Sequence, residues 1–254
     1  MPLDDWGASL ASIAVYSMKG GVGKTTLAVN LAWLAATQSA RRTLLWDLDG
    51  QAGSSFILAG DVQSRYPASE VIEGSIDPIK LVQETATPGL SLLPADSSLR
   101  MLDTTFEEID RKKHLRRMLE NLGKHFDRII LDCPPGLGTT SDQILRAATL
   151  ILLPMIPSTL SRRAFADVRD HLMLHHKGRP RLYPIYNMVD RRRASHRQAI
   201  EADPGCPAIP MASAVEQMAD RHAAIGAYAP RSPAAQAMAS LWVSIERWLA
   251  TEPS

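Results

Sequence analysis

Met18-Lys19-Gly20-Gly21-Val22-Gly23-Lys24-Thr25-Thr26 is the most informative segment of this 254-residue chain. It lies between a short apolar run, Ser12–Ser17, and a helix-like segment that begins near Lys24. Its glycines allow the backbone to curl and to turn its N–H groups toward an anion. The start of the following helix adds the positive end of the helix dipole. The segment therefore predicts a phosphate-binding loop between a strand and a helix.

The side chains of this loop are of the types that phosphoryl transfer uses. We expect Lys24 to reach the β- and γ-phosphates of a nucleotide, the Thr25 hydroxyl to bind Mg²⁺, and Thr26 to reach the α-phosphate. The predicted nucleotide-binding residues of the loop are Gly20, Gly21, Val22, Gly23, Lys24, Thr25 and Thr26. The general pattern G-x-x-x-x-G-K-[ST] is incomplete, because Met18 occupies its first position. A second lysine, Lys19, lies upstream of Lys24.

Two further apolar segments end in aspartate. Thr43–Asp47 is followed by Asp49, and Arg128–Asp132 is followed by the sequence Cys-Pro-Pro-Gly-Leu-Gly. Carboxylates at the carboxyl ends of parallel strands point into the crevice where phosphates bind. Asp132 ends a Walker B pattern and is predicted to hold Mg²⁺ through water. The glycines that follow it permit backbone movement when a γ-phosphate is present.

Short apolar runs alternate with helix-like segments along the chain. The expected strands are 12–17, 43–47, 90–93, 128–132, 149–153 and 182–186, and the expected helices are about 24–39, 104–126, 141–147, 161–175 and 233–250. This alternation predicts an α/β fold with a doubly wound, mainly parallel sheet flanked by helices. Residues 60–87 have weak periodicity and are expected to form a surface subregion. We expect one domain over residues 1–254.

Composition excludes several classes of protein. Apolar residues make up 45% and charged residues 22% of the chain, which is ordinary for a globular domain and excludes disorder or a disulfide scaffold as descriptions of the whole. Neither of the two cysteines belongs to a C-x-x-C pair, so this chain alone predicts no zinc or iron–sulfur site. The acidic N-terminus does not resemble a signal peptide, and we expect a cytoplasmic location.

The three motifs together resemble the ParA/MinD superfamily of ATPases, over roughly residues 10–250. Residues 18–25 match its deviant Walker A pattern, x-K-G-G-x-x-K-[ST], in full. The resemblance implies an Mg²⁺-dependent ATPase, with ATP and Mg²⁺ as cofactors. It implies that Lys19 reaches the nucleotide of a dimer partner, that Asp49 orients the attacking water, and that Asp47 supports the Mg²⁺ shell. Gly50 stands where the family has proline.

The adenine site is also assigned by this resemblance. Asn187 is expected to end one strand and Pro210 to follow another, residues 207–209. In the family, residues at these two places pack around adenine. The segment Asn187-Met188-Val189-Asp190 differs from the guanine-reading pattern N-K-x-D by Met188 in place of lysine, so ATP is preferred to GTP.

A basic region distinguishes the second half of a nearly neutral chain. The formal net charge is +1, yet residues 162–197 contain ten Lys and Arg against three Asp. Such a region can neutralise several phosphates and bind DNA without sequence preference. The resemblance supports this interpretation, because ParA-type members bind DNA through basic residues of their C-terminal half. The alternative is a solvated helix face. The candidate DNA contacts are Arg162, Arg163, Arg191, Arg192, Arg193 and Arg197.

These features favour a ParA-like ATPase that is nucleoid-associated. It would dimerise with ATP, bind nonspecific DNA, and position a plasmid, a chromosome or a protein assembly. We expect a cargo adaptor that stimulates hydrolysis. A MinD-like membrane-associated ATPase is the first alternative, although the amphipathic segment 233–254 is poor in basic residues and is expected to pack on the domain itself. A metal-centre or cofactor maturation ATPase is the second alternative.

Overall fold

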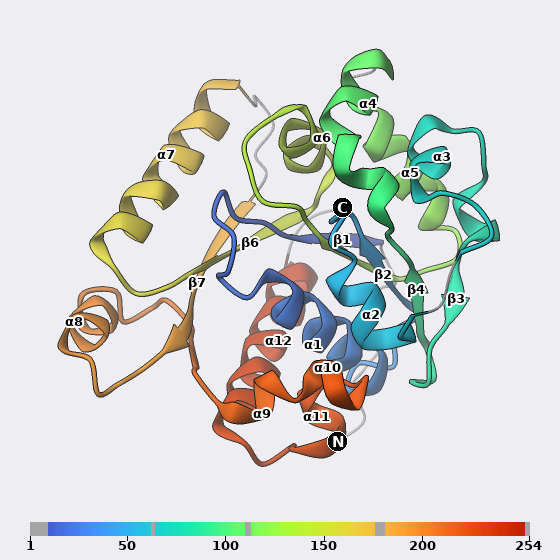
Figure 1. Ribbon diagram of the computed structural model, residues 1–254. Helices are drawn as coiled ribbons and strands as arrows, with labels where there is room; N and C mark the ends of the chain where they lie inside the picture. The colour runs from blue at the N-terminus through green and yellow to red at the C-terminus, as the bar shows by residue number, and fades with distance from the viewer. Residues whose placement is uncertain (1–9, 62–63, 110–112, 176–180, 252–254) are drawn as a thin grey trace.

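The structure is a computed structural model that describes residues 10–61, 64–109, 113–175 and 181–251, without the side chains of residues 171–175. Its centre is an eight-stranded sheet in the order β3-β4-β2-β5-β1-β6-β7-β8, with helices on both faces (Figure 1). All neighbouring strands are parallel except β3 and β4, which pair antiparallel at one edge. The predicted α/β fold with a mainly parallel, doubly wound sheet is confirmed.

The elements alternate along most of the chain. The strands are β1 (Ala11–Val15), β2 (Thr43–Asp47), β3 (Gln83–Glu84), β4 (Leu90–Leu93), β5 (Arg128–Asp132), β6 (Leu150–Met155), β7 (Arg181–Val189) and β8 (Ala208–Pro210). The helices before the basic region are α1 (Lys24–Thr37), α2 (Gly53–Ala59), α3 (Ala68–Glu73), η1 (Pro78–Lys80), η2 (Ser97–Met101), α4 (Leu102–Ile109), α5 (His114–Leu122) and α6 (Thr139–Ala147). They are followed by α7 (Thr159–His175), α8 (Ala194–Ala202), α9 (Ser213–Glu216), α10 (Met218–Arg221), α11 (Ile225–Tyr228) and α12 (Pro233–Thr251).

The three strands that precede the sequence motifs are neighbours in the sheet. β5 lies between β1 and β2, and Asp132 is paired in register with both Val15 and Asp47. These strands are buried along their whole length, as expected for parallel strands covered on both faces. The phosphate-binding loop and the two strand-end carboxylates therefore meet at one edge of the sheet.

Two apolar layers cover the sheet. On one face α1 packs with α12 and the short helices α9–α11, around buried residues such as Leu31, Met238 and Trp242. On the other face α3–α7 pack on the sheet around residues such as Phe106 and Leu119. Figure 1 shows α1 and α12 side by side below the sheet and α4–α6 above it. The last helix is thus part of the core, as expected from its apolar spacing.

Three local expectations were wrong in detail. In place of one helix over 104–126, the structure describes α4 (Leu102–Ile109) and a separate α5 that begins at His114, because Lys113 before it is not helical. Asn187 lies within β7 rather than at its end, since an irregularity in the β7–β8 pairing carries the strand on to Val189. Pro210 is the last residue of β8 rather than the residue after it.

Candidate functional site at the phosphate-binding loop

The phosphate-binding loop joins β1 to α1, as its sequence predicts. Gly21 and Gly23 have φ angles of 71° and 85°, in the left-handed region that favours glycine. A Cβ on Gly20 or Gly21 would meet no described atom within 4 Å, so this side of the loop is open. A Cβ on Gly23 would instead collide with the side-chain amide of Asn187. The loop thus has an open backbone cradle on one side and a packed contact on the other.

Asp132 lies at the end of β5 and is fully buried. Its Oδ2 accepts a hydrogen bond of 2.7 Å from the Ser54 hydroxyl, whereas its Oδ1 is buried with no hydrogen-bond partner among the described residues. Burial raises the pKa of Asp132, and the nearby Ser54, Thr25 and Lys24 act in the opposite direction. A buried carboxylate oxygen without a donor is suited to a water molecule of an Mg²⁺ shell.

Asp47 has different surroundings, although it is just as buried. Its Oδ1 accepts from the Asp49 backbone N–H at 3.1 Å, and its Oδ2 accepts from the backbone N–H and hydroxyl of Ser55 at 2.9 and 2.8 Å. Burial raises the pKa of Asp47, and the charge of Asp132 raises it further. These hydrogen bonds of Asp47 therefore hold the segment that carries Asp49 in place. Its support of the Mg²⁺ shell stays a prediction.

Asp49 and Gly50 form the turn after β2. The Asp49 carboxylate accepts from the Gln51 backbone N–H at 3.0 Å and is half-buried at the edge of the site. A Cβ on Gly50 would lie 2.9 Å from the backbone nitrogen of Arg100. The η2 segment approaches this turn so closely that only glycine fits without displacement. The departure from the family's proline has a local structural reason.

Asn187 and Pro210 are brought near the loop by the outer strands. The buried Asn187 side chain donates a hydrogen bond of 2.8 Å to the Val22 carbonyl oxygen, and Pro210 is paired with Val189 on the adjacent strand. Met188 has a φ of 53°, which is unusual for a side chain of this size and places it in the irregular part of β7. Asn187 is thus a contact of the phosphate-binding loop. The adenine roles of both residues stay predictions.

Comparisons with known proteins agree with this geometry. The model of a protein family described as "AAA domain" matches residues 10–177. The chromosome partitioning protein ParA of Caulobacter vibrioides is 32% identical over 150 residues, which are 58% of this chain and 56% of that protein. The chain belongs to the AAA-domain family and, within it, to the ParA/MinD superfamily of ATPases. It matches somewhat more than half of the length of such curated relatives.

Solved structures of this superfamily have the same fold. A structure titled cobyrinic acid a,c-diamide synthase from Mycobacterium smegmatis, with bound ATP analog and magnesium, has a TM-score of 0.80 and 27% identity, covering 95% of this chain and 96% of that one. The cell division ATPase MinD of Pyrococcus furiosus has a TM-score of 0.77 at 24% identity, covering 94% and 99%. The open glycine cradle, Thr25 and the unpartnered oxygen of Asp132 fit ATP and Mg²⁺, the cofactors of ParA/MinD ATPases.

The two lysines of this ParA/MinD loop lie in opposite surroundings. Lys24 opens α1 and is only 7% exposed, so its ammonium group is held within the site. Lys19 is exposed on the loop before it. These positions are compatible with the roles expected from the resemblance, in which Lys24 serves its own nucleotide and Lys19 serves that of a partner. Both roles stay predictions.

The candidate DNA contacts lie in two segments that follow adjacent strands. Arg162 and Arg163 are exposed in the first turn of α7, and Arg191–Arg193 are exposed between β7 and α8. Phe165 of α7 packs against the buried cluster that contains Tyr186 of β7, so the first half of α7 lies close to that strand. The two segments therefore share the sheet edge that carries the phosphate-binding loop. Figure 1 shows α7 and α8 beside each other at this side of the molecule.

Two of these arginines are occupied by local contacts. Arg192 forms an ion pair of 2.9 Å with Asp190, and the Arg197 guanidinium donates to the carbonyl oxygens of Arg191 and Arg192, both at 2.9 Å. Within the described residues, no ion pair is recorded for Arg162, Arg163, Arg191 or Arg193. The sequence cannot distinguish the arginines with local contacts from those without, because all carry the same charge and only the fold of the turn sets their contacts.

Sequence reasoning missed two serines at the start of α2. Ser54 bonds to Asp132, and Ser55 bonds to Asp47. The available signal was a pair of hydroxyl residues a few positions after Asp49. No spacing rule says which carboxylate each serine reaches, since that depends on how α2 packs across the ends of β2 and β5.

Proposed function

We propose that the protein is an Mg²⁺-dependent ATPase that dimerises with ATP, binds DNA without sequence preference, and positions a cargo. The cargo is a plasmid, a chromosome or a protein assembly, connected through an adaptor that stimulates hydrolysis. The observation that carries this proposal is the shared sheet edge, which holds both the phosphate-binding loop and the arginine segments of α7 and α8. The nucleotide site therefore lies beside the proposed DNA-binding surface, so that ATP binding or hydrolysis can alter that surface.

The nucleotide half of the proposal rests on four side chains. Lys24 and Thr25 bind the phosphates and Mg²⁺, Asp132 holds the metal's water through its Oδ1, and Asp49 orients the attacking water. Phosphoryl transfer depends mostly on such positioning and on stabilisation of charge, so Asp49 need not be a strong base. The exposed Lys19 crosses to the partner's nucleotide in the ATP dimer.

The DNA half rests on exposed arginines that form no ion pair with another described residue. We assign phosphate contacts to Arg162, Arg163, Arg191 and Arg193. Arg192 and Arg197 shape the turn that presents them, through the contacts with Asp190 and with backbone carbonyl groups. Binding through phosphates alone is independent of sequence and weakens steeply with salt.

The membrane alternative is less well supported. The apolar side of α12 is packed against α1 and the sheet, with Met238, Leu241, Trp242 and Ile245 buried. An interfacial helix needs that side free for the bilayer. Within the described part of the chain, no helix is long and apolar enough to cross a membrane.

The test is fluorescence anisotropy of a labelled random-sequence duplex, titrated with protein in ATP or ADP at several salt concentrations. We expect tight binding with ATP only. The double variant Arg191→Glu/Arg193→Glu should weaken it and reduce the slope of log affinity against log salt by about two, because two DNA phosphates are no longer neutralised.

The matched control is Arg231→Glu/Arg247→Glu, which makes the same change of net charge at positions before and within α12. It should bind DNA almost as the wild type does. Equal weakening in both double variants would mean that overall charge, and not this surface, governs binding. Absence of binding in both nucleotide states would refute the DNA-binding part of the proposal.

A further inference from the structure

The first turn of α2 connects the two strand-end carboxylates to each other. Ser54 and Ser55 are adjacent in sequence and both are buried, yet each holds a different carboxylate. The Ser54 hydroxyl donates to Asp132 Oδ2, whereas the Ser55 hydroxyl and backbone N–H donate to Asp47 Oδ2. A single turn of helix thus fixes the orientation of both carboxyl groups.

The Ser54 contact determines which oxygen of Asp132 stays available. With Oδ2 engaged by Ser54, the buried Oδ1 is the oxygen that lacks a donor among the residues described. The same turn approaches the phosphate-binding loop, because a Cβ on Gly53 would lie 3.4 Å from the Thr25 hydroxyl oxygen. The two groups that fit Mg²⁺, Thr25 and Asp132, are therefore both in contact with the start of α2.

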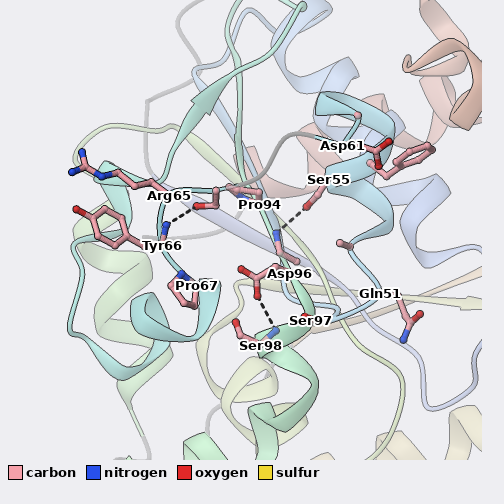
Figure 2. A pocket seen from close by; sticks show the side chains of 15 residues that line it. Gln51, Ser55, Asp61, Arg65, Tyr66, Pro67, Pro94, Asp96, Ser97 and Ser98 are labelled. Carbon is pink, nitrogen blue, oxygen red and sulfur yellow. Dashed lines mark hydrogen bonds between the residues drawn. The ribbon is translucent and has the colours of Figure 1, made fainter.

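Ser55 also bonds to the segment after β4, away from Asp132. Its hydroxyl oxygen also accepts a hydrogen bond of 2.9 Å from the Ala95 backbone N–H, beyond the end of β4. Figure 2 shows this bond at the wall of an open cavity of about 960 Å³, between α2 and the segments around Tyr66 and Ser97. Ser55 consequently links Asp47, and through it the Asp49 turn, to the surface of this cavity.

We propose that Ser54 and Ser55 are positioning residues that couple the metal site to α2: Ser54 orients Asp132 for Mg²⁺, and Ser55 ties α2 to the Asp49 turn. Each serine acts through the carboxylate to which it donates. Binding of Mg²⁺ with nucleotide then restrains α2 through Ser54. This inference rests on the ATP and Mg²⁺ site of the proposed function, and it is independent of DNA binding.

The first measurement is the Mg²⁺ requirement for binding a fluorescent ATP analogue. Partners of this kind typically contribute a factor of about 10 to 100 in metal affinity. Ser54→Ala should therefore raise the Mg²⁺ concentration at half-maximal binding about tenfold or more, while its affinity for the analogue in EDTA stays that of the wild type. Ser54→Cys keeps the size of the side chain with a weaker donor, and it should change the requirement in the same direction if Ser54→Ala fails to fold.

The second measurement is amide hydrogen exchange over residues 50–60, with and without Mg²⁺ and nucleotide. Mg²⁺ should increase protection of α2 in the wild type and should fail to do so in Ser54→Ala. Ser55→Ala should keep the wild-type Mg²⁺ requirement but lose protection of the Asp49 turn in both states. Ser97→Ala, which changes an exposed serine of the same cavity, is the control and should match the wild type in both measurements.

The outcomes separate this inference from the proposed function. If the wild type binds the analogue with Mg²⁺ and the Ser54 variants show an unchanged Mg²⁺ requirement and unchanged protection, the positioning role is refuted while the ATPase assignment stands. If the wild type itself binds no ATP analogue, the proposed function fails and this inference fails with it. A fall in affinity in EDTA equal to that in Mg²⁺ would show a merely structural role for Ser54.

Discussion

Lys19 and Lys24 belong to one loop and have the same side chain, but the fold buries Lys24 and exposes Lys19. Lys24 is 7% exposed at the start of α1. Burial raises the pKa of the nearby Asp132, and the charge of Lys24 partly opposes that rise. Lys19 is exposed, so its ammonium group is free to meet a second molecule at the open edge of the sheet. The difference comes from their places relative to the three glycines, which turn the chain between them.

This difference predicts opposite phenotypes for two similar substitutions. Lys24→Ala should abolish nucleotide binding, because it removes the cation that serves the β- and γ-phosphates. Lys19→Ala should bind nucleotide normally and remain monomeric with ATP. Titration with a fluorescent nucleotide measures the first property, and light scattering after gel filtration measures the second. Undiminished ATP-dependent dimerisation of Lys19→Ala would remove Lys19 from the partner's site.

Gly50 is a second position where a single residue sets local packing. Because a Cβ there would lie 2.9 Å from the Arg100 backbone nitrogen, Gly50→Ala should displace η2 and lower the free energy of unfolding by about 1–3 kcal/mol, as overpacking does. Gly205→Ala is the control, since a Cβ on Gly205 meets no described atom within 4 Å and should change stability by less than about 0.5 kcal/mol. Urea denaturation followed by circular dichroism compares the two. Equal effects would contradict the close approach of η2.

At the scale of elements, α12 is anchored to the sheet by a buried ion pair. Arg128 begins β5, and its guanidinium forms two hydrogen bonds of 2.8 and 2.9 Å with the Glu246 carboxylate of α12. The side chains are only 5% and 18% exposed. The helix also places the Trp242 indole N–H 2.8 Å from the Ser39 hydroxyl, just beyond α1. These two polar contacts fix the orientation of α12 on an interface that is otherwise largely apolar.

Removing the Glu246 carboxylate from this ion pair should lower the free energy of unfolding. Glu246→Ala removes the carboxylate bonded to Arg128, which keeps its bond to the Asp127 carbonyl oxygen, so we expect the free energy of unfolding to fall by about 1.5–3 kcal/mol, as for loss of a hydrogen-bonded charged partner. Glu246→Gln retains an acceptor for Arg128 and should lose less. Chemical denaturation of the variants measures both values. A change below about 0.5 kcal/mol for Glu246→Ala would show that α12 is held by its apolar face alone.

Much of this element-level architecture could be predicted from the sequence. The near-continuous apolar runs predicted β2, β4 and β5 with the observed bounds, because strands covered on both faces leave little room for polar residues. Periodicity could not predict the separation of α4 from α5, since it does not show where a polar run ends one helix and begins another. The short edge strand β3 gave no apolar signal, as it pairs on one side only.

The candidate site was predictable to the level of motifs. Lys24 and Thr25 begin the helix after β1 and Asp132 ends the adjacent β5, so all three lie at the same edge of the parallel sheet, while their roles stay predictions. The contacts of Ser54 and Ser55, the Asn187 bond to Val22 and the separate use of Arg192 all depend on how a loop or a first helical turn packs. Two of these contacts, Ser54 with Asp132 and Asn187 with Val22, join residues far apart in sequence, so no local pattern encodes them.

At the scale of the whole molecule, nucleotide state, dimerisation and DNA binding form one cycle in the proposed function. In this cycle Asp49 orients the water for hydrolysis, the step that returns the protein to its ADP state. The backbone of Asp49 is held by Asp47 rather than by the phosphate-binding loop. Removing its carboxylate therefore leaves the phosphate-binding loop unchanged. The ATP-bound form should then accumulate.

Asp49→Ala should bind ATP and dimerise but hydrolyse ATP more slowly, by a factor on the order of 100. It should stay on DNA after a chase that removes free ATP, whereas the wild type dissociates. Phosphate release and anisotropy decay measure the two effects, and Asp61→Ala, an exposed aspartate beyond α2, is the control. Normal turnover of Asp49→Ala would exclude the carboxylate from the mechanism.

The strand order also indicates how this architecture can change over evolution. The motif-bearing strands are contiguous as β2-β5-β1, whereas the arginine segments follow β6 and β7 on the other side of β1. A chimera that exchanges residues after β6 with those of a relative would replace the half that carries the arginine segments and conserve the half that carries the three sequence motifs. Such an exchange must preserve the residues after β6 that bond to the first half, among them Asn187, which donates a hydrogen bond to the Val22 carbonyl oxygen, and Glu246, which pairs with Arg128.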